Sequence, residues 1–196
     1  MIKRCFDIFA SVLVLLVLSP FFLLLCLAIV IDSRGGIFFT QKRVGKNNRD
    51  FHLYKFRSMV SNAEKSGQLT VGTNDRRITR VGGFIRKYKL DEFPQLINII
   101  KGDMSIVGPR PEVRKYVDLY NEEQLKVLSV RPGLTDYASL EYINENEILG
   151  KASDPEKVYI EEIMPAKLQL NLRYIQEQGL KTDLKIIFRT IGKIVK

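Results

Sequence analysis

Residues 8–31 read IFASVLVLLVLSPFFLLLCLAIVI, and no charged residue occurs between Asp7 and Asp32. A run of about 24 residues would extend roughly 36 Å as a straight helix, against a hydrocarbon core about 30 Å thick. The run is too long for a secretory signal and lacks a small-residue cleavage site. The segment is therefore predicted to insert into a membrane.

Ser19-Pro20 lies at the middle of this run. Proline removes one backbone hydrogen bond and clashes with the carbonyl four residues earlier, so it bends a helix, and a neighbouring Ser hydroxyl can bond the freed backbone groups. Both flanks are basic, so the positive-inside rule places neither end outside. A re-entrant loop and a kinked helix that crosses the membrane both fit the residues.

The composition limits the function without choosing it. The chain has 196 residues, a net charge of +9 and 27% charged residues. A basic excess fits nucleic acid, an anionic membrane surface or a phosphate-bearing ligand. The single histidine, His52, excludes a His-based zinc site, and no Walker A pattern is present.

The remainder is predicted to be α+β and mainly helical. Residues 37–43 and 50–56 are aromatic and β-prone with turn formers between them, which indicates a β-hairpin. Residues 58–74 are predicted to form a loop, and residues 107–111 a stiff extended segment because proline disfavours helix before it. The predicted helices cover residues 79–88, 90–100, 112–128 and 159–178, followed by a last one capped by Thr182 or Asp183.

The last helix is basic on one side and apolar on the other. Lys and Arg recur at about four-residue spacing from Lys181 to Lys196, opposite Leu184, Ile187 and Ile191. Such a helix suits the surface of an anionic membrane. A helix that packs on the core with a solvated face gives the same pattern, and the apolar N-terminal run favours the membrane interpretation.

The segment 89–95, KLDEFPQ, is the sharpest chemical feature. Carboxylates at a helix start are stabilised by backbone N–H groups, so the pKa of Asp91 is expected to be low, as an ionised nucleophile requires. Glu92 could hold Mg²⁺, which prefers carboxylate, water and phosphate oxygens. Acidic residues that merely cap a helix give the same local pattern.

Basic residues surround this pair in the sequence, and a diphosphate substrate needs such groups. Prolines on both sides of Arg110 make its loop rigid, which reduces the entropy lost on binding. Tyr137 and Tyr142 are candidates either for lining a pocket or for core packing. The candidate substrate-binding residues are Lys55, Arg57, Arg80, Arg86, Pro109, Arg110, Pro111 and Arg131.

Five ordered blocks then carry a resemblance: FTQKRVG at 39–45, YKFRSM at 54–59, LDEFPQLIN at 90–98, KGDMSIVGPRP at 101–111 and RPGLT at 131–135. Together with the Ser19-Pro20 break, this set resembles the bacterial sugar transferase family, the monotopic polyprenyl-phosphate phosphoglycosyl transferases. The match covers nearly the whole chain, and the absence of further apolar runs implies the minimal catalytic form.

The resemblance implies a re-entrant membrane helix over residues 1–35 and a catalytic domain over 36–196, on the cytoplasmic face of the bacterial inner membrane. Asp91 would attack the β-phosphorus of a UDP-sugar and release UMP, and polyprenol phosphate would then displace the phosphosugar from Asp91. Glu92 would bind Mg²⁺, and the Arg110 loop would contact the uridine diphosphate. The expected partners are UDP-sugar, polyprenol phosphate and membrane lipid, without nucleic acid; a homo-oligomer stays open.

One region departs from the family pattern. Many small members continue after the Arg-Pro-Gly turn with Thr-Gly and an Ala-Gln-Val stretch, whereas residues 135–141 here read TDYASLE. This region is a candidate for choosing the sugar. The alternatives to the enzyme are a non-catalytic, membrane-anchored scaffold of a polysaccharide assembly complex and a tethered nucleic-acid binder.

Overall fold

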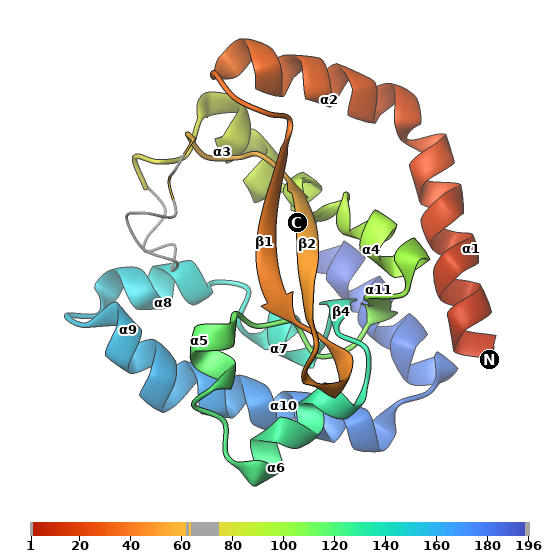
Figure 1. Cartoon of the computed structure of the whole chain (residues 1–196), viewed down its shortest axis with the longest axis vertical. Helices are drawn as coiled ribbons and strands as arrows, with labels where there is room; N and C mark the ends of the chain where they lie inside the picture. Colours follow the sequence, from red (N-terminus) through yellow and green to blue (C-terminus); the bar gives the residue numbers. More distant parts are fainter. Residues whose placement is uncertain (1, 62, 64–74, 195–196) are drawn as a thin grey trace.

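The N-terminal segment of the computed structural model, which describes residues 2–61, 63 and 75–194, forms two helices at an angle of 65°. Helix α1 covers Ile2–Val17 and α2 covers Ser19–Asp32, and they run along one edge of the molecule (Figure 1). The Ser19 hydroxyl donates to the Leu16 carbonyl at 2.8 Å, so it bonds a group that the break leaves free. Within the described residues, no single helix has the length and apolar composition to cross a membrane; only the bent pair meets both criteria together.

The predicted hairpin is confirmed. Strands β1 (Phe38–Val44) and β2 (Asp50–Phe56) pair antiparallel from Phe38↔Phe56 to Val44↔Asp50. The connecting 3₁₀ turn η1 (Lys46–Asn48) contains Asn47 and Asn48 at positive φ, which Asn tolerates better than most residues. The hairpin passes through the middle of the molecule, and Leu53 and Phe56 of β2 are buried in two separate hydrophobic clusters.

Helix α3 (Arg80–Lys87) begins as predicted, because the Thr79 hydroxyl accepts from the Gly82 N–H. The prediction of a single helix over 90–100 is wrong. This segment forms a 3₁₀ turn, η3 (Leu90–Glu92), and a separate helix, α4 (Gln95–Lys101), with Pro94 at the N-cap of α4. Proline has no N–H to continue a hydrogen-bond ladder, so the two acidic residues lie in the turn that precedes the α-helix.

A short parallel pair of strands is not predicted by the sequence. Strand β3 (Ser105–Val107) pairs with β4 (Gly133–Thr135) in the register Ser105↔Gly133 and Val107↔Thr135. Just after β3, the two backbone segments approach so closely that a Cβ on Gly133 would lie 2.1 Å from the Gly108 nitrogen. Glycine is therefore required at this contact, which fixes the segment that leads into Pro109.

The helix predicted over 112–128 is also wrong, because three short elements replace it: α5 (Arg114–Val117), α6 (Glu122–Leu125) and η4 (Lys126–Ser129). Asn121 explains the break. Its side chain accepts from the Gln124 N–H at 2.9 Å and so starts a new helix with a capping box.

The C-terminal half is helical and builds the largest buried cluster. The predicted helix over 159–178 is observed as a π-helical turn, η5 (Tyr159–Ile163), continued by α10 (Met164–Glu177). Residues of α5, α8, η5 and α10 share one hydrophobic cluster. The other helices of this half are α7 (Tyr137–Glu141), α8 (Glu145–Lys151), α9 (Pro155–Val158) and α11 (Leu180–Ile194).

Helix α11 begins earlier than predicted, so Thr182 and Asp183 lie in its first turn and do not cap it. Asp183 is buried, where it accepts hydrogen bonds from Lys3 of α1 and from the Tyr174 hydroxyl. Ile186 is fully buried, whereas Phe188 is 70% exposed. The helix thus packs on the core and also presents an apolar residue outward.

Candidate functional site

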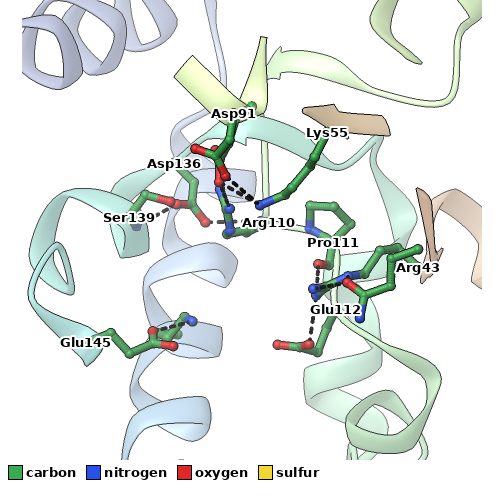
Figure 2. A network of polar contacts seen from close by, with 12 residues as sticks. Arg43, Lys55, Asp91, Arg110, Pro111, Glu112, Asp136, Ser139 and Glu145 are labelled. Carbon is green, nitrogen blue, oxygen red and sulfur yellow. Dashed lines mark hydrogen bonds and ion pairs between the residues drawn. The ribbon is translucent and has the colours of Figure 1, made fainter. Parts of the chain in front are cut away.

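Asp91 and Glu92 lie side by side in η3 and are both buried. Lys55 of β2 reaches them from the hairpin. Its Nζ lies 3.0 Å from Oε1 of Glu92 and 3.9 Å from Oδ2 of Asp91 (Figure 2). Lys55, which the sequence predicts only as a substrate-binding residue, thus contacts the acidic pair from an element far away in the sequence.

Arg110 completes the cluster from the loop after β3. Its Nη1 donates to Oε2 of Glu92 at 3.1 Å and its Nη2 donates to Oε1, a bidentate contact. The Arg110 backbone N–H donates to Oδ2 of Asp136 at 3.1 Å, and Oδ1 of Asp136 accepts from the Ser139 N–H at the start of α7. The parallel strands and the α7 cap therefore fix the position of Arg110.

The pKa values of the two carboxyl groups are shifted in opposite directions. Burial raises the pKa of Asp91, and the nearby Lys55 opposes this rise. Burial also acts to raise the pKa of Glu92, but Arg110 and Lys55 outweigh it and hold that pKa well below its usual range. The expected lowering for Asp91 is wrong, because the residue lies buried in a 3₁₀ turn that Pro94 separates from the N-terminus of α4.

A cavity of about 420 Å³ opens beside this cluster, and we call it the Asp91 cavity. One side is cationic, with Lys55, Arg86, Lys89 and Arg110 around the two carboxylates. The lining from β4, α7, the turn after α7 and α11 is largely apolar, although it also contains Lys193 of α11. Its apolar residues are Leu134, Ala138, Leu140, Ile143, Ile187, Ile191 and Ile194. The cavity therefore suits a ligand with an anionic part and a part that tolerates apolar surroundings.

Three of the predicted basic residues, Lys55, Arg86 and Arg110, line this cavity. The structure does not bring Arg57 to it. The Arg57 guanidinium is buried against the end of α2, where it donates to the carbonyls of Ile29, Ser33, Arg34 and Gly36. It therefore satisfies the orphan carbonyls of that helix end.

Arg80 and Arg131 are also outside the lining of the Asp91 cavity. Arg80 is exposed at the first position of α3, and Arg131 is exposed with its Nε donating to the Gly102 carbonyl at 2.8 Å. Pro109 accepts from the Gly133 N–H through its carbonyl. Pro111 lines a second cavity, of about 200 Å³, on the other side of Arg110. Tyr142 lines the Asp91 cavity, as one alternative for it predicted.

Four residues that line both cavities are Arg110, Glu145, Asn146 and Lys167. Of these, only Arg110 is predicted by the sequence. Asp136 was missed as well, although an Asp three residues before Ser139 at a helix start is a detectable cap signal. Lys167 and Glu145 form an ion pair at 2.7 Å between α10 and α8, and no local pattern indicates that contact.

The acidic pair offers a site for Mg²⁺ only together with a ligand. In the part of the chain that the structure describes, no group of three His, Cys, Asp or Glu residues is arranged to hold a metal ion. Mg²⁺ commonly takes one or two carboxylates and completes its shell with water and substrate phosphate oxygens. Glu92 accepts three hydrogen bonds from Lys55 and Arg110, which leaves about one lone-pair position, on Oε2. Asp91 and Glu92 therefore fit a metal that a diphosphate brings with it.

Comparison with known proteins identifies relatives along the whole chain. The family model described as bacterial sugar transferase matches residues 1–196. The UDP-N-acetylgalactosamine-undecaprenyl-phosphate N-acetylgalactosaminephosphotransferase of Aeromonas hydrophila is 40% identical over 99% of the chain and 44% of its own length. The undecaprenyl-phosphate glucose phosphotransferase of Komagataeibacter xylinus is 39% identical over 97% of the chain and 35% of its own length.

A shorter relative matches almost end to end. The exopolysaccharide production protein PSS of Rhizobium leguminosarum bv. phaseoli is 38% identical over 97% of the chain and 93% of its own length. The chain thus spans less than half the length of the first two relatives and most of the third.

Proposed function

The chain belongs to the bacterial sugar transferase family, and on that premise we propose that it transfers a sugar 1-phosphate from a UDP-sugar to polyprenol phosphate. The products are polyprenyl-diphospho-sugar and UMP, which makes this the first membrane step of a glycoconjugate pathway. The observation that carries the proposal is a buried carboxylate, Asp91, within a cluster of cations at the edge of a cavity that is apolar on its far side.

In the first step, an Asp91 carboxylate oxygen attacks the β-phosphorus of the UDP-sugar. The bond from that phosphorus to the bridging oxygen breaks, and UMP leaves with the bridging oxygen. Charge grows on the leaving phosphate, and Lys55, Arg86 and Arg110 line the cavity where it forms. The raised pKa of Asp91 makes the carboxylate more basic than an exposed one, which strengthens it as a nucleophile while it stays ionised.

In the second step, a phosphate oxygen of polyprenol phosphate attacks the same phosphorus. The acyl phosphate bond to Asp91 breaks, and the free carboxylate is restored. Glu92 and Asp91 would hold Mg²⁺ with the diphosphate, and the metal would neutralise phosphate charge. Arg110 and Lys55 keep Glu92 ionised throughout, because their positive charges lower its pKa.

We also propose that the bent pair α1–α2 enters one leaflet and returns, so that residues 1–35 form a re-entrant anchor for a domain over 36–196 on the cytoplasmic face. The 65° angle and the exposed apolar side chains support this. Examples are Phe9, Leu16, Leu23, Leu24 and Leu27.

Cysteine labelling in intact and opened vesicles tests that topology. Cys5 and a Gly36→Cys substitution, in a Cys26→Ser background, report the two ends of the pair. A re-entrant pair gives labelling of both from the cytoplasmic side, whereas labelling of the two ends from opposite sides would show a crossing helix.

The activity test uses the full chain with Mg²⁺, polyprenol phosphate and a panel of UDP-sugars, with UMP release as the readout. Without acceptor, we expect up to one UMP per protein and a mass adduct of one sugar phosphate on Asp91. Asp91→Asn should abolish both. Asp103→Asn is the matched control, because Asp103 follows α4 outside the cavity lining. Folded protein that releases no UMP from any UDP-sugar would support the scaffold alternative instead.

A further inference from the structure

The second cavity lies between the Pro111–Glu112 segment, Arg43 of β1 and α10. It adjoins the Asp91 cavity through shared walls but does not include Asp91 or Glu92 in its lining. Figure 2 shows Arg110 beneath Asp91, with Arg43 and Glu112 farther from the carboxylate. A group bound in the second cavity would therefore lie next to a substrate whose phosphorus is at Asp91, with the shared lining residues between them.

The charges of the second cavity are paired with one another. Nη1 of Arg43 lies 3.1 Å from Oε1 of Glu112, and the Tyr159 hydroxyl donates to Oε2 of the same carboxylate. Nζ of Lys167 lies 2.7 Å from Oε2 of Glu145. Apart from Arg110, which the two cavities share, the charged residues of this lining are paired with one another, so the cavity offers a phosphate no cation of its own. It suits a neutral group that exchanges several hydrogen bonds.

Asn171 of α10 points to the same conclusion. Its side chain is 4% exposed and lines the cavity, and its Oδ1 is buried with no hydrogen-bond partner among the described residues. A buried acceptor without a donor is costly, so such a group commonly marks the place of a missing partner. A hydroxyl or amide N–H of a ligand would supply the donor.

The geometry of the two-step transfer indicates which part of the substrate belongs here. Attacking and leaving oxygens lie roughly in line at phosphorus. UMP therefore leaves on the side opposite Asp91, and polyprenol phosphate later attacks from that same side. Both can use the Asp91 cavity, whose apolar wall includes Ile187 and Ile191 of α11. The sugar stays on the phosphorus through both steps and needs a separate place.

We propose that the second cavity is the sugar subsite and that Asn171 Oδ1 accepts a hydrogen bond from a hydroxyl or acylamino N–H of the sugar. This rests on the proposed function, since it assumes that a sugar phosphate is transferred at Asp91. It makes Asn171 a specificity residue and places sugar recognition on α10 and the Glu112 segment. Residues 135–141, which differ from the family pattern, would then not be the main determinant of the sugar.

The test compares Asn171→Leu with the wild-type protein in steady-state kinetics on the UDP-sugar panel, and measures inhibition by UMP. Leucine keeps the branched shape and the number of side-chain heavy atoms of asparagine, although it is larger, and it removes the unpaired carbonyl; because Asn171 borders a cavity that can take the extra volume, the melting temperature should not fall. We expect kcat/KM for the preferred UDP-sugar to drop about five- to tenfold, which corresponds to one neutral hydrogen bond. The preference over other UDP-sugars should shrink, and UMP inhibition should stay within about twofold. Gln169→Leu, an exposed position on the same helix, is the control.

A second arm measures binding of UDP-sugar and UMP to the Asp91→Asn protein with and without Asn171→Leu. Loss of UDP-sugar affinity with unchanged UMP affinity supports the subsite. Unchanged affinity for both UDP-sugar and UMP overturns the proposed sugar subsite. Equal weakening of both ligands also overturns it, because that result would show that the cavity takes the nucleoside. Absence of UMP release by wild-type protein would refute the proposed function, and the binding arm would still decide the subsite. Asn171→Ala replaces the leucine variant if that protein melts early.

Discussion

The Arg110–Glu92 pair allows the electrostatics of the site to be measured directly. Arg110→Met removes the guanidinium and keeps much of the side-chain length. Breaking a fully buried ion pair costs about 3–5 kcal/mol. The Arg110 side chain is 33% exposed and Lys55 still contacts Glu92 at 3.0 Å, so solvent screening and the second cation reduce the expected loss to about 2 kcal/mol.

For a chain of this size, such a loss corresponds to a fall in melting temperature of about 4–8 °C. The assay is thermal unfolding at pH 7 of four proteins: wild type, Arg110→Met, Glu92→Gln and the double variant. Because Glu92→Gln removes the charge that Arg110 neutralises, adding Arg110→Met to it should cost little more. The expected coupling free energy is thus about 2 kcal/mol, and a value below about 0.5 kcal/mol would refute the reasoning.

The low pKa of Glu92 determines how the stability difference between wild type and Arg110→Met changes with pH. A carboxyl group whose pKa is depressed on folding contributes stability that is present above its unfolded pKa and is lost as pH falls through the folded value. The difference between wild type and Arg110→Met should therefore be fully present at neutral pH and diminish in acid. A difference that grows as the pH falls would contradict the assigned pairing.

Three further results are expected. Asp91→Asn should melt higher than wild type at pH values above the raised Asp91 pKa, because burial makes ionisation of Asp91 costly in the folded state. This advantage should shrink as the pH falls below that pKa and vanish once the pH is also below the unfolded pKa; an advantage independent of pH would exclude this cause. Lys55→Gln should shift the acid limb of the pH profile of kcat/KM to higher pH, because the positive charge of Lys55 lowers the Asp91 pKa. Lys55→Arg keeps that charge and should leave the limb in place. An acid limb that does not move in Lys55→Gln would show that it does not report the ionisation of Asp91. Gly82→Ala should destabilise α3 by about 2 kcal/mol or more because the new Cβ would meet the Ser58 carbonyl at 2.0 Å, and Gly83→Ala, with open space, should be neutral or stabilising in the same thermal melts.

The sequence predicts the parts of this molecule that depend on local pattern. The hairpin, the helix capped by Thr79 and the break at Ser19-Pro20 follow from alternation, cap chemistry and proline. The helices predicted over 90–100 and 112–128 fail for a related reason: the apolar pattern is continuous in both, but Pro94 and Asn121 offer competing backbone arrangements. Periodicity alone does not weigh those competitors.

The site shows a different limit. The sequence predicts Asp91, Glu92, Lys55 and Arg110 as site residues, and the structure brings these four together. Arg57, a predicted site residue with the same positive charge as Lys55 and Arg110, lies against a helix end instead. Which guanidinium meets a carbonyl and which meets a cavity depends on packing between segments far apart in sequence. The sign of the Asp91 pKa shift has the same origin, because burial outweighs the local helix start only once the surrounding chain is in place.

The position of Arg110 depends on the N-terminal helix as well as on its own loop. Oδ2 of Asp7 accepts from the Ser105 hydroxyl at 2.8 Å, and Oδ1 accepts from the Ile106 N–H. Lys3 donates to the Val107 carbonyl at 3.1 Å and to the buried Asp183 of α11. The first two turns of α1 therefore form hydrogen bonds with all three residues of β3, whose end leads through Gly108 and Pro109 into Arg110. Helix α1 is therefore connected to Arg110 through β3 and the backbone that follows it. On the proposed re-entrant insertion, the depth of the anchor would thus also set the height of Arg110 above the lipid.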